Sequence, residues 1–128
     1  MKNKNSSKPR LTFIAVIIIG LIGMQSCTNS HELRIDLQSW FYNDSVKVEV
    51  NGQVVYNNLV STDSLLGVAD IKSLNYPEGS YPIKVTINNT FTKTETVNLD
   101  HYKCMAVKYN ASTNELEFIY YPTPLMYY

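Results

Sequence analysis

Few residues of this chain could perform nucleophilic chemistry. The sequence holds two cysteines, Cys27 and Cys104, and two histidines, His31 and His101. A cysteine becomes a strong nucleophile when a nearby histidine takes its proton, and His101 stands three residues before Cys104. Residues three apart along a β-strand point to opposite faces, so this spacing does not favour a catalytic pair. We therefore expect Cys104 to be a buried, unreactive thiol.

Metal and acid–base chemistry has equally little support. Four aspartates lie near the ends of expected strands, where their oxygens could bind calcium: Asp44, Asp63, Asp70 and Asp100. Aspartate is also an ordinary turn residue, which is the simpler interpretation. The chain has no His-x-x-x-His, Gly-x-Ser-x-Gly, phosphate loop or Cys-x-x-Cys. Paired acids of a glycosidase would need a cleft that so small a domain hardly encloses. We expect no enzyme, no cofactor and no metal.

Aromatic residues are the unusual feature of the composition. All ten tyrosines follow Cys27, and the chain has one tryptophan. Exposed aromatic rings can hold a sugar or a protein partner. The candidate binding surface consists of Trp40, Phe41, Tyr42, Tyr127 and Tyr128. The competing interpretation places aromatic side chains in the core, and it is favoured for Trp40, Tyr81, Tyr102 and Phe118. Residues 122–128 show no strand pattern, so they either fold back over the domain or engage a partner.

The first 24 residues have the layout of an export signal. Four basic residues, Lys2, Lys4, Lys8 and Arg10, precede the uncharged run Leu11–Met24. As a helix, this run of 14 residues would extend roughly 21 Å at about 1.5 Å per residue. A bilayer core is about 30 Å thick, so the length favours a signal peptide over a transmembrane helix. The transmembrane helix is the alternative.

The residues that follow, Met24-Gln-Ser-Cys27, resemble the lipobox of bacterial lipoproteins. Ser26 and Cys27 match its two main positions, whereas Met24 and Gln25 differ from the usual Leu and small residue. The resemblance implies cleavage after residues 1–26 and a diacylglycerol on Cys27, with residues 27–31 as a tether. Thr28 stands where an Asp would retain such a protein at the inner membrane. The resemblance therefore implies the outer membrane of the cell envelope. Residues 28–31 also lack the acidic cluster of surface-exposed Bacteroidota lipoproteins, which favours the periplasmic side.

Charge excludes one class of partner. Without residues 1–26, the chain has seven Lys and Arg against eleven Asp and Glu, a formal charge of −4. Nucleic acids are bound by clustered basic residues that displace counterions from the phosphates. We therefore expect no nucleic-acid partner.

The elements that must position these residues are short strands. Apolar and polar residues alternate over 33–37, 46–50, 81–87, 102–109 and 116–120. Threonine alternates with other residues over 91–98, residues 53–57 form the second arm of a hairpin, and a further strand is expected over 65–71. Asn51-Gly52 predicts a tight hairpin in which Val48 faces Val55 and Lys47 faces Tyr56. Turns are expected at 76–80 and 110–114.

Seven to eight short strands with no helix after the signal predict an all-β fold, a single antiparallel β-sandwich over residues 32–128. An open barrel is the alternative. The stretches 41–56 and 77–87 are similar to parts of immunoglobulin-like and carbohydrate-binding sandwiches, and a jelly-roll-like order is equally compatible. This resemblance implies a fold and no activity.

The functional hypothesis is a lipid-anchored, non-enzymatic binding or envelope accessory module. Its partner is an envelope protein in the leading version. Two alternatives are kept: a carbohydrate-binding module of a glycan-uptake system, and a small hydrolase or hydrolase inhibitor.

Overall fold

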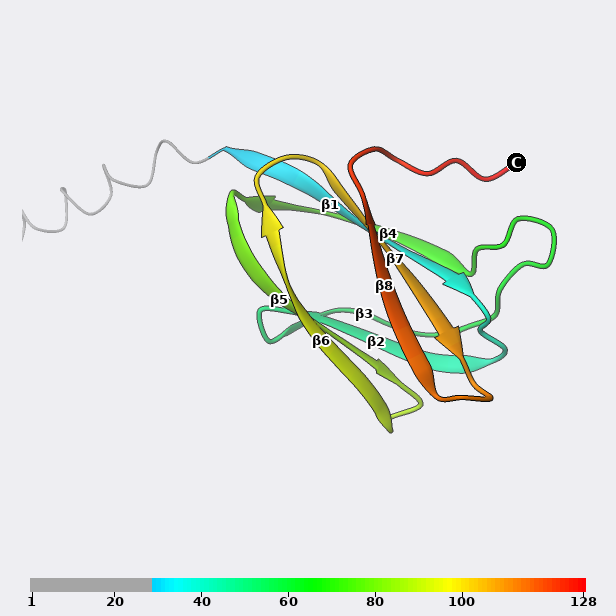
Figure 1. Ribbon diagram of the computed structural model, residues 1–128. Helices are drawn as coiled ribbons and strands as arrows, with labels where there is room; N and C mark the ends of the chain where they lie inside the picture. The colour runs from blue at the N-terminus through cyan, green and yellow to red at the C-terminus, as the bar shows by residue number, and fades with distance from the viewer. Residues whose placement is uncertain (1–28) are drawn as a thin grey trace, which may run out of the picture.

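The computed structural model of this chain describes residues 29–128, which form an all-β sandwich (Figure 1). The predicted fold class is therefore confirmed. Within these residues, eight strands make two four-stranded sheets that pack face to face. Residues 1–26 and Cys27, for which the signal peptide and the lipid are predicted, lie outside the described residues.

The first sheet has the order β4-β1-β7-β8 and the second the order β3-β2-β5-β6. The strands of the first sheet are β4 (Asp70–Pro77), β1 (Ser30–Ser39), β7 (Lys103–Asn110) and β8 (Glu115–Tyr121). The strands of the second sheet are β3 (Gln53–Val60), β2 (Asp44–Val50), β5 (Gly79–Ile87) and β6 (Phe91–Leu99). β1 thus begins inside the expected tether, because Ser30 and His31 already pair with Pro77 and Tyr76 of β4.

One pair of strands departs from the predicted antiparallel arrangement. β1 and β7 run parallel, with Leu33 opposite Lys103 and Leu37 opposite Val107. A parallel pair needs a long connection between its strands. Here the connection between β1 and β7 consists of β4 and the four strands of the second sheet. All other neighbouring strands are antiparallel.

The core lies between the inner faces of the two sheets and follows the alternation in the sequence. Leu33, Ile35 and Leu37 of β1 point inward, and Ile83 and Val85 of β5 meet them from the other sheet. Side chains of a half-buried strand alternate in this way because successive residues face opposite sides.

The β2–β3 hairpin forms at Asn51-Gly52 as predicted, with φ angles of 52° and 83°. Its predicted register is wrong, because Val48 pairs with Tyr56 and Glu49 with Val54. Val55 is the extra residue of a β-bulge. The bulge turns the Tyr56 ring inward, where its hydroxyl donates a hydrogen bond to Asp70 Oδ2 at 2.6 Å.

The strand expected over residues 65–71 is also wrong. Residues 61–69 form a loop, and the strand starts only at Asp70. It ends at Pro77, two residues into the turn expected over 76–80. The loop is favoured because Asp63 caps a local turn, described below, and because Leu65 and Leu66 have no sheet face to cover.

Candidate functional site

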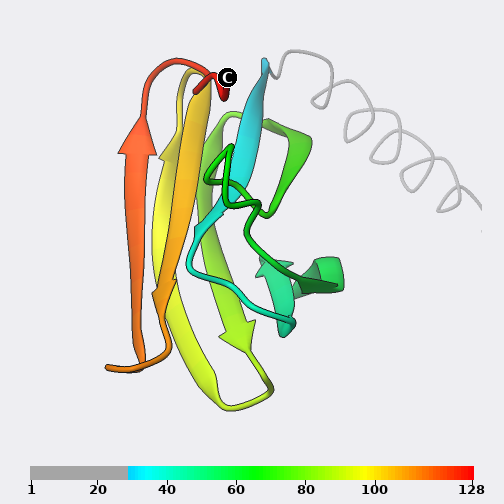
Figure 2. The same ribbon diagram turned by 90° about the vertical axis from the view of Figure 1, so that its right-hand side faces the viewer.

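The loops at one end of the sandwich carry four exposed apolar side chains, Trp40, Tyr42, Leu65 and Leu66. The turns between β1 and β2, β3 and β4, β5 and β6, and β7 and β8 all lie at the end where β1 stops at Ser39. This distal end is opposite the start of β1 at Ser30, and its loops after β1 and β3 face the viewer in Figure 2.

Two of these loops, residues 40–43 and 61–69, are joined by hydrogen bonds. The N–H of Thr62 donates to the carbonyl of Phe41 at 2.9 Å, and the N–H of Phe41 donates to Thr62 Oγ1 at 2.9 Å. The N–H of Asn43 donates to Ser61 Oγ at 2.7 Å. The two loops therefore form one ordered surface.

The middle residue of the aromatic triplet anchors this surface. Phe41 is only 3% exposed, and its ring stacks on Tyr109 with 5.9 Å between centroids. Its neighbours point the other way, so Trp40 is 71% exposed and Tyr42 is 86% exposed. Phe41 is thus a core residue and was wrongly included in the binding surface. Trp40, in turn, was wrongly favoured for the core.

A turn closed by Asp63 holds two leucines in solvent. Asp63 Oδ1 accepts hydrogen bonds from the N–H groups of Leu65 at 2.8 Å and Leu66 at 3.0 Å, and these bonds lower the pKa of the carboxyl. Gly67, with φ of 74°, donates its N–H to the Asp63 carbonyl at 2.8 Å. Leu65 is 88% exposed as a result, and Leu66 is also exposed.

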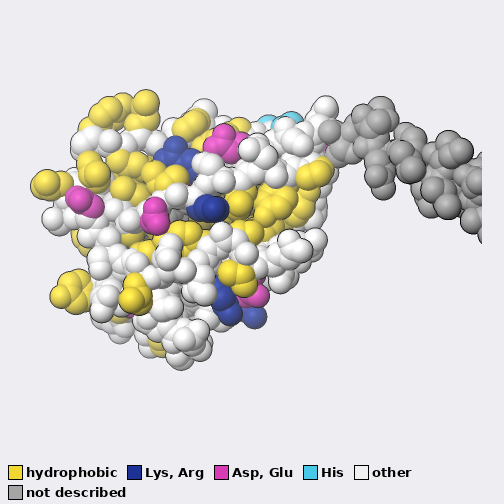
Figure 3. Space-filling model, turned by 180° about the vertical axis from the view of Figure 1, so that it is seen from behind, with side chains coloured by type: hydrophobic (Ala, Val, Ile, Leu, Met, Phe, Trp, Pro, Cys, Tyr) yellow, Lys and Arg dark blue, Asp and Glu magenta, His cyan; other side chains and the backbone are white. Residues whose placement is uncertain are grey.

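We call the four exposed residues Trp40, Tyr42, Leu65 and Leu66 the apolar tip. Figure 3 shows hydrophobic side chains projecting separately at the end of the molecule away from the start of β1. Apolar side chains that gather on one surface mark interaction sites, and the hydrogen bonds between loops 40–43 and 61–69 bring these four to the same end of the sandwich. Leu65 and Leu66 were missed in the sequence, although the spacing Asp63-x-Leu-Leu-Gly67 is a signal for a capped turn.

A shallow pocket of about 630 Å³ opens beside Trp40. Lys108 and Asn110 of β7 line it, and Glu115 and Glu117 of β8 face them. One aromatic wall beside groups of both charges could hold a polar ligand through stacking and hydrogen bonds.

No protein-family model matches this chain, and no curated protein has a similar sequence. Within residues 29–128, the structure contains no helix long and apolar enough to cross a membrane.

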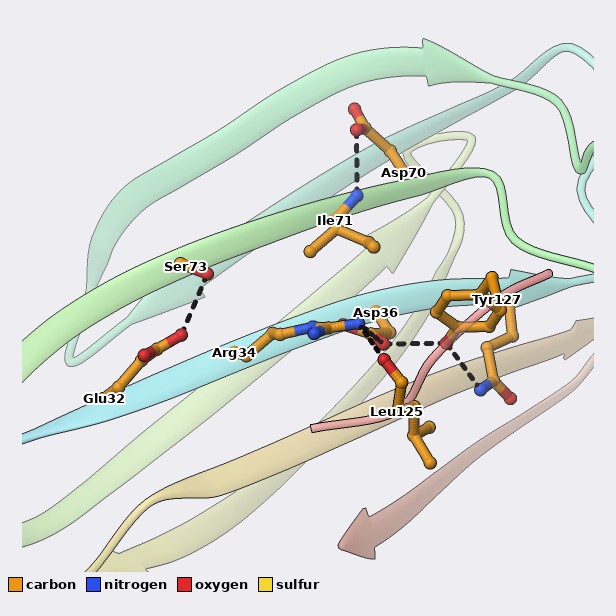
Figure 4. A network of polar contacts seen from close by, with 9 residues as sticks. Glu32, Arg34, Asp36, Asp70, Ile71, Ser73, Leu125 and Tyr127 are labelled. Carbon is orange, nitrogen blue, oxygen red and sulfur yellow. Dashed lines mark hydrogen bonds and ion pairs between the residues drawn. The ribbon is translucent and has the colours of Figure 1, made fainter. Parts of the chain in front are cut away.

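Residues Pro122–Tyr128, the C-terminal segment, fold back over the outer face of the first sheet (Figure 4). Arg34 binds Asp36 through two hydrogen bonds of 2.6 and 2.8 Å, and its Nη2 also donates to the carbonyl of Leu125 at 2.9 Å. The Tyr127 hydroxyl donates to Asp36 Oδ2 at 2.7 Å and accepts from Gln38 Nε2 at 2.9 Å. Of the two open interpretations of this segment, the structure favours folding back.

Burial sets the electrostatics of this covered face. Asp36 is fully buried, and its hydrogen bonds raise the pKa of Arg34 above the usual value. Burial, followed by the effect of Asp36, raises the pKa of Tyr127 to about 12. Tyr127 is therefore a half-buried structural residue, whereas Tyr128 is exposed.

The remaining titratable candidates take structural roles. Cys104 is buried, and burial raises the pKa of its thiol to about 11. His101 contacts Asp100 in an exposed turn. Asp44 accepts hydrogen bonds from the N–H of Tyr42 and from Asn88. Nowhere in residues 29–128 do three His, Cys, Asp or Glu side chains gather as a metal site would require.

Proposed function

We propose that this chain is a lipid-anchored, non-enzymatic lipoprotein of the outer membrane that binds an envelope protein through its apolar tip. The tip is the observation that carries the proposal. It combines two aromatic and two aliphatic side chains on loops joined by hydrogen bonds. A few buried residues, Trp and Tyr often among them, contribute most of the binding free energy in protein interfaces.

The chemistry of the tip favours a protein over a sugar. A sugar site needs hydrogen-bonding groups around the aromatic ring, because the hydroxyl groups of the ligand must be satisfied. The tip instead places Leu65 and Leu66 near the aromatic loop, and the carboxyl of Asp63 is occupied by backbone N–H groups. An apolar surface of a second protein meets these requirements.

The position of the tip agrees with an anchor at Cys27. The start of β1 lies at one end of the sandwich and the tip lies at the other. A lipid at residue 27 would hold the near end beside the bilayer, since two or more acyl chains anchor a protein stably. The tip would then point away from the membrane, towards a partner in the periplasm.

The test of the tip is co-purification from envelope extract with the full-length protein as bait. Leu65→Asp should remove the captured protein, because it places a charge in the centre of the apolar contact. Thr94→Asp is the control, since Thr94 is exposed on β6 outside the tip and its cross-strand partner is Lys84. Equal capture by wild type and Leu65→Asp would overturn the proposal.

The anchor is tested separately by fatty-acid labelling in cells. Cys27→Ala should abolish labelling and leave the signal uncleaved, because the acylated thiol is the substrate of signal peptidase II in this family. Ser26→Ala is the matched control and should still be labelled, since Ala is also a small residue. Labelling that persists in Cys27→Ala would refute the lipoprotein assignment.

A glycan is the second candidate ligand, and the pocket beside Trp40 is the observation that favours it. In that case Glu117→Gln should weaken binding of the full-length protein to a glycan array, while Leu65→Asp should not. Glycan binding that is unchanged in Glu117→Gln, together with loss of the captured protein in Leu65→Asp, would exclude the glycan as the ligand. The alternative from another class, a hydrolase or its inhibitor, would be revived by a turnover that His101→Ala or Asp100→Ala abolishes.

A further inference from the structure

The four edge strands of the sandwich differ in how they are protected from pairing with another chain. Exposed edges are normally blocked by charged side chains or proline. β4 has Asp70, Lys72 and Pro77, and β8 has Glu115 and Glu117. β3, with the sequence Gln-Val-Val-Tyr-Asn-Asn-Leu-Val, has no charged residue and no proline, and its one feature of this kind is the β-bulge at Val55.

The edge formed by β6 is protected further. Lys93 and Glu95 form an ion pair at 3.2 Å, and Tyr120 of β8 donates its hydroxyl to Glu95 at 2.7 Å. Lys93 also donates to the carbonyl of Leu116 at 3.1 Å. These contacts bridge β6 to β8 and close that side of the sandwich. β3 has a single such contact with the first sheet, the hydrogen bond from Tyr56 to Asp70 of β4.

Exposed apolar side chains lie along the β3 edge. Val54 is 54% exposed and Leu59 is 68% exposed. Val54 pairs with Glu49 of β2, and Leu59 pairs with Ser45 of β2. The residues next to Glu49 and Ser45 on β2 are valines that point inward, so Val54 and Leu59 both lie on the outer face of the sheet. A neutral strand with exposed apolar residues is a template for an added strand.

The bulge at Val55 makes this strand complementary to itself. In an antiparallel pair, opposite residues must share a face. A two-fold axis at Asn57 places Tyr56 opposite Asn58 of the second copy, both on the inner face. With Val55 accommodated as the extra residue in each copy, Val54 then lies opposite Leu59 of the second copy, both on the outer face. Without the bulge, these two exposed residues would fall on different faces.

We propose that two copies of this chain pair antiparallel along β3, with the two-fold axis at Asn57. The two second sheets then form one continuous sheet across the dimer. Each exposed Val54 is covered by Leu59 of the other copy, and the contact is made twice by symmetry. β3 itself brings no charged side chain to the pairing: Lys47 and Glu49 lie on the neighbouring β2, and the Asp70 carboxylate is occupied by the Tyr56 hydroxyl. The dimer goes beyond the proposed function, since β3 contains no residue of the apolar tip.

Disulfide cross-linking of the full-length protein in the cell envelope tests this register. Opposite residues of an antiparallel pair have Cα atoms about 4.5 to 5.5 Å apart, within reach of a disulfide. Asn57→Cys should therefore give a covalent dimer under mild oxidation. Thr94→Cys is the matched control, because Thr94 is exposed on β6 at the other edge of the same sheet. It should remain monomeric.

A second substitution separates specific pairing from chance collision. Leu59→Lys in the Asn57→Cys background should lower the yield of cross-linked dimer at least tenfold, because lysines then oppose the apolar contact at both ends of the paired strands. Circular dichroism of each variant checks that the fold is retained. Undiminished cross-linking in the double variant, equal cross-linking of Thr94→Cys, or a disulfide to a different protein would each overturn the proposal. Capture of a partner by the tip is measured independently, so either proposal can fail alone.

Discussion

Asp36 is a charged residue whose side chain is completely buried on the outer face of a sheet. A carboxylate in this position is tolerated only when hydrogen bonds replace its lost water. Arg34 supplies two of them and Tyr127 a third. The residue thereby ties the C-terminal segment to β1, and the same segment covers Cys104.

Removing the arginine should destabilise the fold strongly. Arg34→Ala leaves the Asp36 carboxylate buried without its charge partner, a change that costs about 3–5 kcal/mol of unfolding free energy. Urea unfolding followed by far-ultraviolet circular dichroism measures this loss. Lys84→Ala, on the exposed face of β5, serves as the control and should change stability by no more than about 0.5 kcal/mol. Equal effects of the two substitutions would mean that the Arg34–Asp36 pair contributes nothing.

The thiol of Cys104 should be slow to react in the folded protein. Its pKa of about 11 leaves about one thiolate in a thousand at pH 8, whereas an ordinary cysteine has a pKa near 8.5. We expect a thiol reagent to label the Cys27→Ala variant slowly at pH 8 and rapidly after unfolding in urea. Fast, stoichiometric labelling of the native variant would show that the C-terminal segment does not cover this thiol.

At the residue scale, the sequence shows which residue types could form a binding surface, but not which of their side chains are buried. The triplet Trp40-Phe41-Tyr42 was recognisable as a candidate surface because three adjacent aromatics exceed what a core needs. Its alternation of exposure was not predictable. It depends on Phe41 stacking on Tyr109, a residue about 70 positions away in the chain. The burial of Tyr127 depends in the same way on Asp36.

At the scale of elements, one aspartate closes the turn within the loop 61–69. Asp63→Ala should speed hydrogen exchange at the Leu65 and Leu66 amides, because it removes their shared acceptor. Exchange measured by mass spectrometry reports this, and Asp100→Ala, in a turn at the opposite end, should leave the loop unchanged. Retained protection in Asp63→Ala would show that the backbone alone orders the loop.

The same loop should respond to acid in a defined direction. Hydrogen bonds from Leu65 and Leu66 lower the pKa of Asp63 in the folded protein. A depressed carboxyl pKa stabilises the loop above the unfolded value of about 3.9, and this stability is lost as pH falls through the folded pKa. Amide exchange of the loop should therefore rise relative to that of β1 below about pH 4. A constant ratio down to pH 2 would contradict this.

Strands with regular alternation were predictable because one face of each is buried. The bulge at Val55 was not, since it depends on contacts between distant elements, and the position of the loop 61–69 depends on such contacts as well, although its turn at Asp63 has a local signal. Tyr56 reaches Asp70 across the sandwich, and Thr62 binds Phe41. Local patterns carry no signal for such contacts.

At the scale of the whole molecule, the order of the strands in each sheet could not be predicted from the sequence. Alternation predicts how many strands exist, but not that β1 sits between β4 and β7 or that it runs parallel to β7. That arrangement makes β1 the strand on which the first sheet depends.

The central place of β1 has a consequence for folding. Leu33 of β1 pairs with Leu74 of β4 on one side and with Lys103 of β7 on the other. The chain must therefore close long loops before either pair forms. Domains dominated by such contacts fold in milliseconds to seconds. We expect stopped-flow refolding followed by circular dichroism to fall in this range. Trp40 fluorescence is a poor probe, since the ring is exposed in both states.

The substitution Ile35→Ala, in the centre of β1, should lower the free energy of unfolding by about 2–5 kcal/mol, whereas Ile71→Ala at the exposed edge of β4 should lower it much less. Refolding within microseconds, or equal costs for the two substitutions, would mean that β1 is not the strand that organises the sandwich.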